Sequence, residues 1–153
     1  MDFTVRSALG NYGVSFCNQR EALNSIGEDS GNNVVYVVDS NVYKTLKTPI
    51  EKSIWLVADE QAKEFDKVGS YLTMLQNLNV NKSTTLVAIG GGVIQDIVAF
   101  LAATYYRGIK WVYLPTTLMA MTDSCIGAKC GINLNGFKNQ VGLFSAPDAV
   151  YIC

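Results

Sequence analysis

The sequence contains no histidine, and no paired C-x-x-C spacing occurs among Cys17, Cys125, Cys130 and Cys153. Because histidines and closely spaced cysteines build most zinc-type sites, we expect free thiols and no metal site formed by this chain alone. Charge is also scarce: charged residues make up 16% of the 153 residues, the net charge is −1, and no basic run occurs. This composition argues against nucleic acid as a main partner.

Long hydrophobic segments are absent as well. The longest apolar run covers residues 97–106, which is too short to cross a bilayer. The first four residues lack the basic and apolar regions of a secretory signal. We therefore predict a cytoplasmic protein with no membrane partner. Hydrophobic residues nevertheless make up 49% of the chain, so its length suits one globular domain with its own core.

The most informative stretch is TLVAIGGGVIQD, at residues 85–96. An apolar, β-branched run meets three glycines and continues into a helix-like run, which predicts a strand, a tight turn and a helix. Glycines at such a turn allow positive φ and remove Cβ atoms, so a phosphate can approach main-chain N–H groups at the helix start. The alternative is a glycine-rich turn without any ligand. The three glycines alone favour neither interpretation.

Two standard nucleotide motifs do not fit this stretch. The G-x-G-x-x-G fingerprint requires glycine at the position of Gln95, and no acidic residue follows Asp96 for more than twenty residues. A P-loop requires Gly-Lys-Ser/Thr after the glycines, which this chain lacks. The ligand, if there is one, is therefore bound by a different glycine turn.

Strands and helices are expected to alternate through most of the chain. Apolar runs at 34–38, 53–58, 86–89 and 110–114 predict buried strands, and helical spacing marks 62–78 and 93–106. This alternation predicts an α/β fold with a mainly parallel sheet flanked by helices. Residues 3–5 and 12–16 favour an N-terminal hairpin or edge strands, and residues 20–26 a helix.

Polar groups follow several of these predicted strands. Asp39 and Asn41 could hold a ribose, although a cap for a short helix at 42–46 explains them locally. Glu60 suits the start of the next helix without any ligand. Residues 115–147 show little helical or strand period, and they combine glycines with many functional side chains. We expect this segment to be a binding loop.

Four motifs after residue 84 occur together in the order and spacing of a known family. They are GGGVIQD, AATYYRG, PTTLMAMTDSCIGAK and GINLNGFKNQVG. In these motifs the chain resembles 3-dehydroquinate synthase and the other sugar phosphate cyclases. The likeness is weaker before residue 84. It implies a Rossmann-like NAD-binding domain, which a helical, metal-binding C-terminal domain follows in the family.

The resemblance implies one group of residues that contacts NAD and one that takes part in catalysis. The first four NAD contacts along the chain, from Asp39 to Lys63, would surround the adenosine and ribose. The next four, from Gly91 to Asp96, would hold the pyrophosphate. The expected NAD contacts are Asp39, Asn41, Glu60, Lys63, Gly91, Gly92, Val93, Asp96, Thr116, Thr117, Lys129 and Lys138. The expected catalytic residues are Arg107, Asp123, Lys129 and Asn139. In the family homodimer, Arg107 would be offered to the neighbouring subunit's substrate phosphate.

The implied activity is phosphate elimination and cyclisation of 3-deoxy-D-arabino-heptulosonate 7-phosphate to 3-dehydroquinate, in the shikimate pathway. NAD accepts a hydride and later returns it, so it acts as a catalyst. The family also uses a divalent metal, zinc or cobalt, whose glutamate and histidine ligands lie downstream of the segment present here. We therefore expect residues 1–153 to form the NAD-binding domain only and to be inactive alone.

Two departures leave the substrate open. Gln95 stands where these synthases usually have glycine, and Cys130-Gly131-Ile132 replaces their usual Thr-Ala-Val. The alternatives are a cyclase acting on sedoheptulose 7-phosphate, a non-catalytic NAD-binding module and a glycerol dehydrogenase relative. The last class usually continues with a Gly/Ser-rich run where this chain has MAMTDSCIGAK. Apolar surface left bare without a second domain predicts self-association or a mobile loop.

Overall fold

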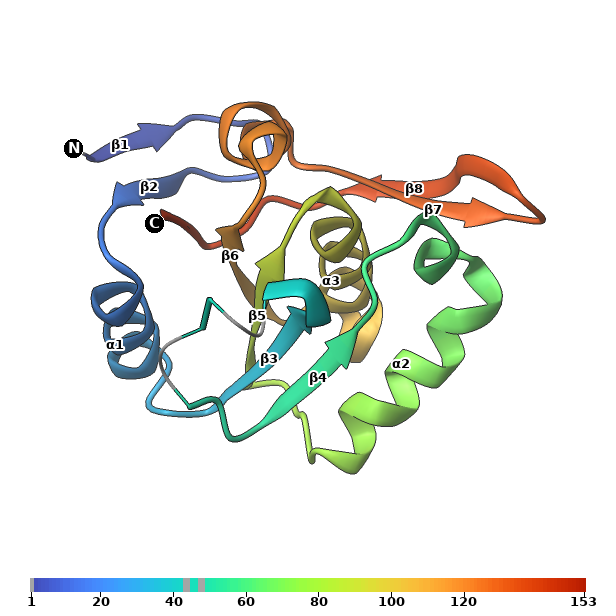
Figure 1. Cartoon of the computed structure of the whole chain (residues 1–153), viewed down its shortest axis with the longest axis horizontal. Coiled ribbons are helices and arrows are strands. Elements are labelled where there is room, and N and C mark those ends of the chain that lie inside the picture. Colours follow the sequence, from blue (N-terminus) through green and yellow to red (C-terminus); the bar gives the residue numbers. More distant parts are fainter. Residues whose placement is uncertain (1, 43–44, 47–48) are drawn as a thin grey trace.

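A mostly parallel β-sheet forms the centre of the molecule (Figure 1). The computed structural model describes residues 2–42, 45–46 and 49–153, and within them the sheet has seven strands in the order β1-β2-β9-β6-β5-β3-β4. Within this sheet only β1 and β2 pair antiparallel, so the predicted α/β fold with an N-terminal hairpin is confirmed. The strands are β1 Asp2–Val5, β2 Tyr12–Phe16, β3 Val34–Asp39, β4 Ser53–Leu56, β5 Thr85–Gly90, β6 Lys110–Pro115 and β9 Ala149–Ile152.

Helices cover both faces of the sheet (Figure 1). Helix α1, Gln19–Asp29, packs on one face, and α2, Phe65–Asn77, and α3, Gly92–Thr104, pack on the other. Successive strand side chains point to opposite faces, so β5 contributes Leu86 and Ala88 to one core and Val87 and Ile89 to the other. Helix α3 is buried along most of its length, as its apolar sequence predicts.

The predicted helix at 62–78 is divided in two. A 3-10 turn, η2, covers Glu60–Lys63, and the α-helix begins at Phe65. Between them Glu64 takes an extended conformation with φ −64° and ψ 134°, which interrupts the helical hydrogen bonding. The side chain of Asp59 caps η2 by accepting a hydrogen bond of 2.8 Å from the Ala62 N–H. The region between β4 and α2 is therefore a capped turn that holds Glu60 and Lys63 in place.

The prediction of an irregular loop over residues 115–147 is wrong. The segment contains a π-helical turn, η4, at Ala120–Ser124, a short helix, α4, at Cys125–Gly127, and an antiparallel hairpin of β7, Lys129–Leu134, and β8, Phe137–Phe144. Asn135 and Gly136 form the hairpin turn with φ 52° and 79°. Positive φ at both turn residues is the geometry that Asn-Gly favours. The segment is thus an ordered arm beside the main sheet (Figure 1).

The end of helix α3 also differs from prediction. Helix α3 ends at Thr104, and a 3-10 turn, η3, follows at Tyr105–Arg107. Tyr106 and Arg107 take φ of 49° and 60°, so the α-helix does not reach Arg107. The short helix predicted at 42–46 lies partly outside the described residues, and a 3-10 turn, η1, is present at Ser40–Val42.

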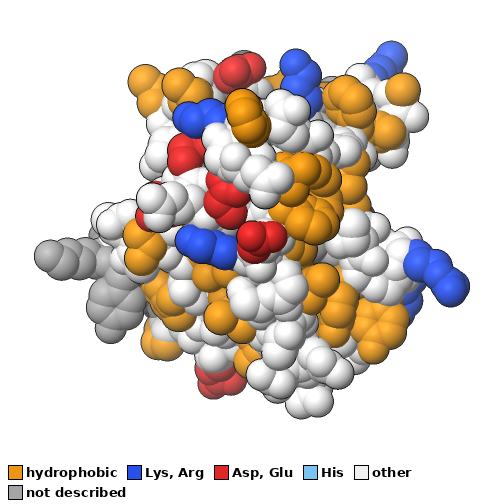
Figure 2. All heavy atoms as spheres, turned by 90° about the vertical axis from the view of Figure 1, so that its right-hand side faces the viewer, with side chains coloured by type: hydrophobic (Ala, Val, Ile, Leu, Met, Phe, Trp, Pro, Cys, Tyr) orange, Lys and Arg blue, Asp and Glu red, His pale blue; other side chains and the backbone are white. Residues whose placement is uncertain are grey.

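Several large hydrophobic side chains are exposed on this scaffold. Leu118 and Met119 are 77% and 74% exposed beside η4, and Phe137 and Phe144 are 70% and 66% exposed on the hairpin. Figure 2 shows hydrophobic side chains gathered in patches beside charged groups on the face that carries α2 and the hairpin. Across the described parts of the chain, no helix is both long and apolar enough to span a membrane.

Candidate functional site

The glycine turn joins β5 to α3, as predicted, but none of its glycines has positive φ. Gly91 has φ −84° and ψ −166°. Crowding explains two of the glycines: a Cβ on Gly90 would lie 2.5 Å from Ile94 Cγ1, and one on Gly91 would lie 3.1 Å from Thr117 Cγ2. The expected positive φ was wrong because the turn is shaped by close packing and not by left-handed backbone.

The first turn of α3 is open. A Cβ on Gly92 would meet no described atom within 4 Å. The first intrahelical bond here runs from the Gln95 N–H to the Gly91 carbonyl at 3.1 Å. The N–H groups of Gly92, Val93 and Ile94 therefore precede the helical ladder, and no side chain caps this end. Such a helix start is suited to an anion.

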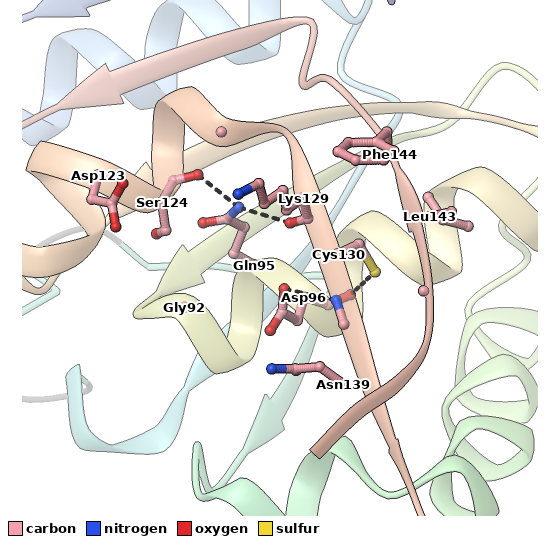
Figure 3. A pocket seen from close by; sticks show the side chains of 13 residues that line it. Gly92, Gln95, Asp96, Asp123, Ser124, Lys129, Cys130, Asn139, Leu143 and Phe144 are labelled. Carbon is pink, nitrogen blue, oxygen red and sulfur yellow. Dashed lines mark hydrogen bonds between the residues drawn. The ribbon is translucent and has the colours of Figure 1, made fainter. Parts of the chain in front are cut away.

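A pocket of about 550 Å³ lies beside this helix start (Figure 3). Helix α3, η4 and the hairpin build it together. Five of the predicted site residues line it, and the first and last of them, Gly92 and Asn139, are 47 positions apart in the sequence. Its lining consists of Gly92, Gln95, Asp96, Asp123, Ser124, Gly127, Lys129, Cys130, Gly131, Asn139, Gly142, Leu143 and Phe144.

A buried ion pair forms one wall of this region. The Lys63 ammonium lies 2.6 Å from Asp96 Oδ2 and donates to Asn139 Oδ1 at 3.0 Å. Asp96 Oδ1 accepts from the Gly131 N–H at 3.2 Å. Burial raises the pKa of the Asp96 carboxyl, and the neighbouring Lys63 opposes that rise. Since Lys63 is only 5% exposed, its charge is stable there because of these two partners.

A second set of contacts ties the hairpin to η2. Asn133 Nδ2 donates to the Glu60 carbonyl at 3.1 Å and to Glu60 Oε2 at 3.2 Å. Asn133 Oδ1 accepts from the Asn139 N–H at 3.0 Å, and Lys138 lies 3.6 Å from Glu60 Oε2. The hydrogen bond from Asn133, with Lys63 and Lys138 nearby, lowers the pKa of Glu60. Glu60 and Lys138 thus lie beside the pocket and do not line it.

Asp39 and Asn41 lie at the end of β3, where Asp39 is close to Gly90 of the glycine turn. Asp39 Oδ1 accepts from both the N–H and Nδ2 of Asn41, at 2.9 and 3.0 Å. These contacts are local ones at the 3-10 turn η1, whereas the helix at 42–46 for which a cap was predicted lies partly outside the described residues. The contacts of Glu60 and Lys63 run to the hairpin and α3. Strands β3 and β4 are parallel neighbours in which Asp39 pairs with Leu56, so both groups of residues follow the carboxyl ends of adjacent strands.

A second pocket, of about 400 Å³, lies at the carboxyl ends of β5 and β6. Thr116 lines it, and the Thr116 N–H donates to the Gly90 carbonyl at 2.9 Å. Its walls are largely apolar, with Val42, Leu46, Ile89, Leu114, Pro115 and Met121 among them. Since Gly92 lines the first pocket and the Gly90 carbonyl accepts from Thr116, which lines the second, the glycine turn lies between the two pockets.

Arg107 is remote from all these groups. It follows α3 at the end opposite the glycine turn, and a 13-residue helix is about 20 Å long. Lys82 donates to the Tyr106 carbonyl at 3.3 Å and to the Gly108 carbonyl, which ties this loop to the start of β5. The structure therefore does not bring Arg107 to this chain's own pocket.

Eight of the 13 lining residues were absent from the predicted site, and Gln95 and Cys130 are two of them. Gln95 is 3% exposed, and its Nε2 donates to the Ser124 carbonyl at 2.9 Å and to the Lys129 carbonyl at 3.5 Å. The available signal was an amide beside Asp96 in a helix whose other residues are mostly apolar. Cys130 is buried beside them, its Sγ donates to the Asp96 carbonyl, and burial raises the pKa of this thiol to about 12.

Together the fold and the pocket define a Rossmann-like α/β domain with polar groups gathered at the carboxyl ends of its parallel strands. Residues 53–153 match the family model described as 3-dehydroquinate synthase N-terminal. The chain belongs to the 3-dehydroquinate synthase family. The resemblance drawn from the glycine turn and the following motifs is confirmed.

Individual proteins show the same likeness. A 3-dehydroquinate synthase of Chlamydia trachomatis serovar L2 is 50% identical over 94 residues, covering 61% of this chain and 25% of that protein. A structure of 2-deoxy-scyllo-inosose synthase complexed with carbaglucose-6-phosphate, NAD+ and Co2+ has a TM-score of 0.86 at 23% identity, over 99% of this chain and 45% of that one. A structure of ValA, a 2-epi-5-epi-valiolone synthase of Streptomyces hygroscopicus subsp. jinggangensis with NAD+ and Zn2+ bound, has a TM-score of 0.79 at 26% identity, over 96% and 44%.

The chain spans about a quarter to a half of the length of the curated relatives it matches. The described residues contain no group of three or more histidine, cysteine or acidic side chains that could hold a metal ion. The residues present therefore do not fit a metal of the kind named for the two solved relatives.

Proposed function

We propose that this chain is the NAD-binding domain of a 3-dehydroquinate synthase-type enzyme. Such an enzyme eliminates phosphate from 3-deoxy-D-arabino-heptulosonate 7-phosphate and closes the ring to 3-dehydroquinate. The observation that carries the proposal is the uncapped first turn of α3, open at Gly92 and placed between two pockets. A dinucleotide is an elongated ligand with a diphosphate at its middle, so its shape matches this arrangement.

In this proposal the N–H groups of Gly91, Gly92 and Val93 hold the diphosphate. The largely apolar pocket at Thr116 takes the adenosine, since flat bases favour apolar walls with a few polar groups. The nicotinamide enters the pocket lined by Asp96 and Lys129. The dinucleotide would thus cross the carboxyl edge of the parallel sheet, where such folds bind their ligands.

Bound NAD+ supplies a reversible hydride acceptor. The residues of this chain bind and orient the reactants. Lys129 offers a cation to the anionic groups of a phosphorylated sugar acid, and Asn139 is held by Lys63 at the opposite wall. Asp123 offers a carboxylate that can accept a hydroxyl proton at the pocket edge. These roles follow from where each side chain lies around one pocket.

A second candidate substrate is sedoheptulose 7-phosphate. The solved relative at 26% identity is a 2-epi-5-epi-valiolone synthase, and the hairpin departs from the usual synthase motif at Cys130-Gly131-Ile132. The Chlamydia protein, at 50% identity, carries the name 3-dehydroquinate synthase and favours the first candidate. Arg107 points to a homodimer in either case, because it lies far from its own pocket and could serve a neighbouring subunit.

The test is calorimetric titration of NAD+ into wild type, Gly92→Val and Gly69→Val. We expect Gly92→Val to fold normally and to weaken NAD+ binding at least tenfold, because its side chain would cover the open helix start. Gly69 also lies in a helix with no atom within 4 Å of a Cβ, so Gly69→Val is the matched control and should bind as wild type. Equal affinity in wild type and Gly92→Val would overturn the proposal.

A further inference from the structure

Two buried polar atoms in the first pocket have no hydrogen-bond partner among the described residues. They are Gln95 Oε1 and Ser124 Oγ, the latter beside the Tyr113 hydroxyl, which donates to the Gly90 carbonyl at 3.3 Å. Both residues line the pocket, and Figure 3 shows the Gln95 amide oxygen turned toward Ser124. A buried polar group without a partner is destabilising, because it has lost its hydrogen bonds to water and gained none in return. Such a pair at a pocket wall indicates a ligand group with matching donors and acceptors.

The orientation of the Gln95 amide is fixed by its other end. Nε2 donates to the carbonyls of Ser124 and Lys129. A flipped amide would set its oxygen against these two carbonyl oxygens, which offer no hydrogen to accept. The oxygen is therefore an acceptor that faces away from these two carbonyls, toward Ser124 at the pocket wall (Figure 3). The Ser124 hydroxyl beside it can donate or accept.

We propose that Gln95 and Ser124 form a subsite for a neutral group that carries an N–H or O–H donor beside an acceptor oxygen. The subsite rests on the proposed function. Gln95 Oε1 accepts from the donor, and Ser124 Oγ donates to the acceptor. Two groups have this chemistry: the carboxamide of nicotinamide and a hydroxyl of a sugar phosphate. An anionic group would meet the lone pairs of Gln95 and belongs instead beside Lys129.

The experiment compares ligands that differ only in this chemistry. Wild type is titrated with NAD+, with 3-acetylpyridine adenine dinucleotide, in which a methyl replaces the carboxamide NH2, and with ADP-ribose, which lacks the ring. Wild type should prefer NAD+ over the acetylpyridine analogue by about tenfold, the value of one buried hydrogen bond. Gln95→Met, which keeps the side chain's length, should reduce this preference to nearly one and leave ADP-ribose binding unchanged.

Two further variants separate recognition from folding. Ser124→Ala keeps the carbonyl that anchors Gln95, so it should weaken NAD+ and the analogue by a similar few-fold factor. Gln76→Met changes an exposed glutamine of α2 and should behave as wild type. Titration of carbaglucose-6-phosphate into NAD+-saturated protein tests whether the subsite binds a sugar hydroxyl. If Gln95→Met binds this sugar phosphate more weakly than wild type and keeps the wild-type preference for NAD+ over the acetylpyridine analogue, the subsite is assigned to the sugar.

If Gln95→Met alters neither the dinucleotide preference nor sugar phosphate binding, the subsite is wrong, and the two atoms serve only water or each other. If wild type binds neither NAD+ nor ADP-ribose, the proposed function fails first and the subsite falls with it. These two failures are distinct because ADP-ribose binding does not involve Gln95.

Discussion

Lys63 is the residue on which the pocket wall depends most. Its ammonium is buried and contacts Asp96 and Asn139, which come from α3 and the hairpin. A lysine after a strand would pass for an exposed side chain in the sequence. Only the fold reveals that its charge is enclosed, because Asn139 is 76 positions away in the chain.

We predict that Lys63→Met lowers the free energy of unfolding by about 3 kcal/mol, because it leaves the Asp96 carboxylate without its partner. Urea denaturation at pH 7.5 measures this loss. Lys67→Met, at an exposed lysine of α2, is the control and should change stability by no more than about 0.5 kcal/mol. Equal stability of Lys63→Met and Lys67→Met would contradict the buried pair.

The pH dependence of this loss follows from Asp96. Burial raises the pKa of Asp96 above its unfolded value, so the folded state binds the proton more readily than the unfolded state. Stability therefore falls as the pH rises from the unfolded pKa of this carboxyl through its folded pKa. Removing Lys63 raises this pKa further. The stability difference between wild type and Lys63→Met should therefore be smaller at pH 5 than at pH 7.5, as denaturation at both values would show. A difference that grows toward acid pH would contradict this sign.

Among single residues, sequence reasoning found the polar groups but not all their neighbours. Asp96, Asp123, Lys129 and Asn139 do line one pocket. Gln95 was noticed only as a departure from glycine, because a sequence does not show which carbonyls an amide will face. The predicted NAD and catalytic roles of all these residues stay predictions until binding is measured.

At the level of elements, the βα units were predictable and the hairpin was not. Strands β3 to β6 are continuous apolar runs, which tertiary context seldom overrides. The hairpin strands contain Gly131, Gly142 and many polar residues, which hide the strand pattern. The Asn135-Gly136 turn between them was a usable signal. Strand β9 depends on non-local pairing with β2 and β6, which the sequence does not show.

The hairpin has a steric requirement at Gly142. A Cβ there would collide with the carbonyl oxygen of Cys130 on the paired strand. We predict that Gly142→Ala lowers the free energy of unfolding by about 1–3 kcal/mol, because a backbone atom cannot move aside as a side chain can. Thermal denaturation followed by circular dichroism measures the effect.

Gly13→Ala is the control for this prediction. Gly13 lies in β2, and a Cβ there would meet no atom within 4 Å. The thermal midpoint of the Gly13→Ala protein should stay at the wild-type value or rise slightly, since alanine lowers the entropy of the unfolded chain. A Gly142→Ala protein as stable as Gly13→Ala would show that the strands are not paired in this register.

For the whole molecule, the exposed hydrophobic side chains predict association. Leu118, Met119, Phe137 and Phe144 are each at least 66% exposed. Patches of this kind usually mark contact surfaces. We predict that the 153-residue chain self-associates reversibly as its concentration rises, as sedimentation velocity would reveal. Phe137→Ser combined with Phe144→Ser should reduce this association, and a monomer at all concentrations would contradict it.

We also predict that the chain of residues 1–153 binds NAD+ without releasing phosphate from 3-deoxy-D-arabino-heptulosonate 7-phosphate. It has no histidine, its described residues hold no metal-binding group, and Arg107 lies far from its pocket. A colorimetric phosphate assay with NAD+ and Zn2+ or Co2+ present measures turnover. Phosphate release above the protein-free background would contradict this prediction.

A crystal structure of the chain grown with NAD+ tests most directly whether the open start of α3 holds the dinucleotide. We predict diphosphate oxygens within hydrogen-bond distance of the Gly92 and Val93 N–H groups, with adenosine at Thr116 and nicotinamide in the pocket of Asp96 and Lys129. A diphosphate bound elsewhere, with the first turn of α3 facing solvent, would contradict the assignment.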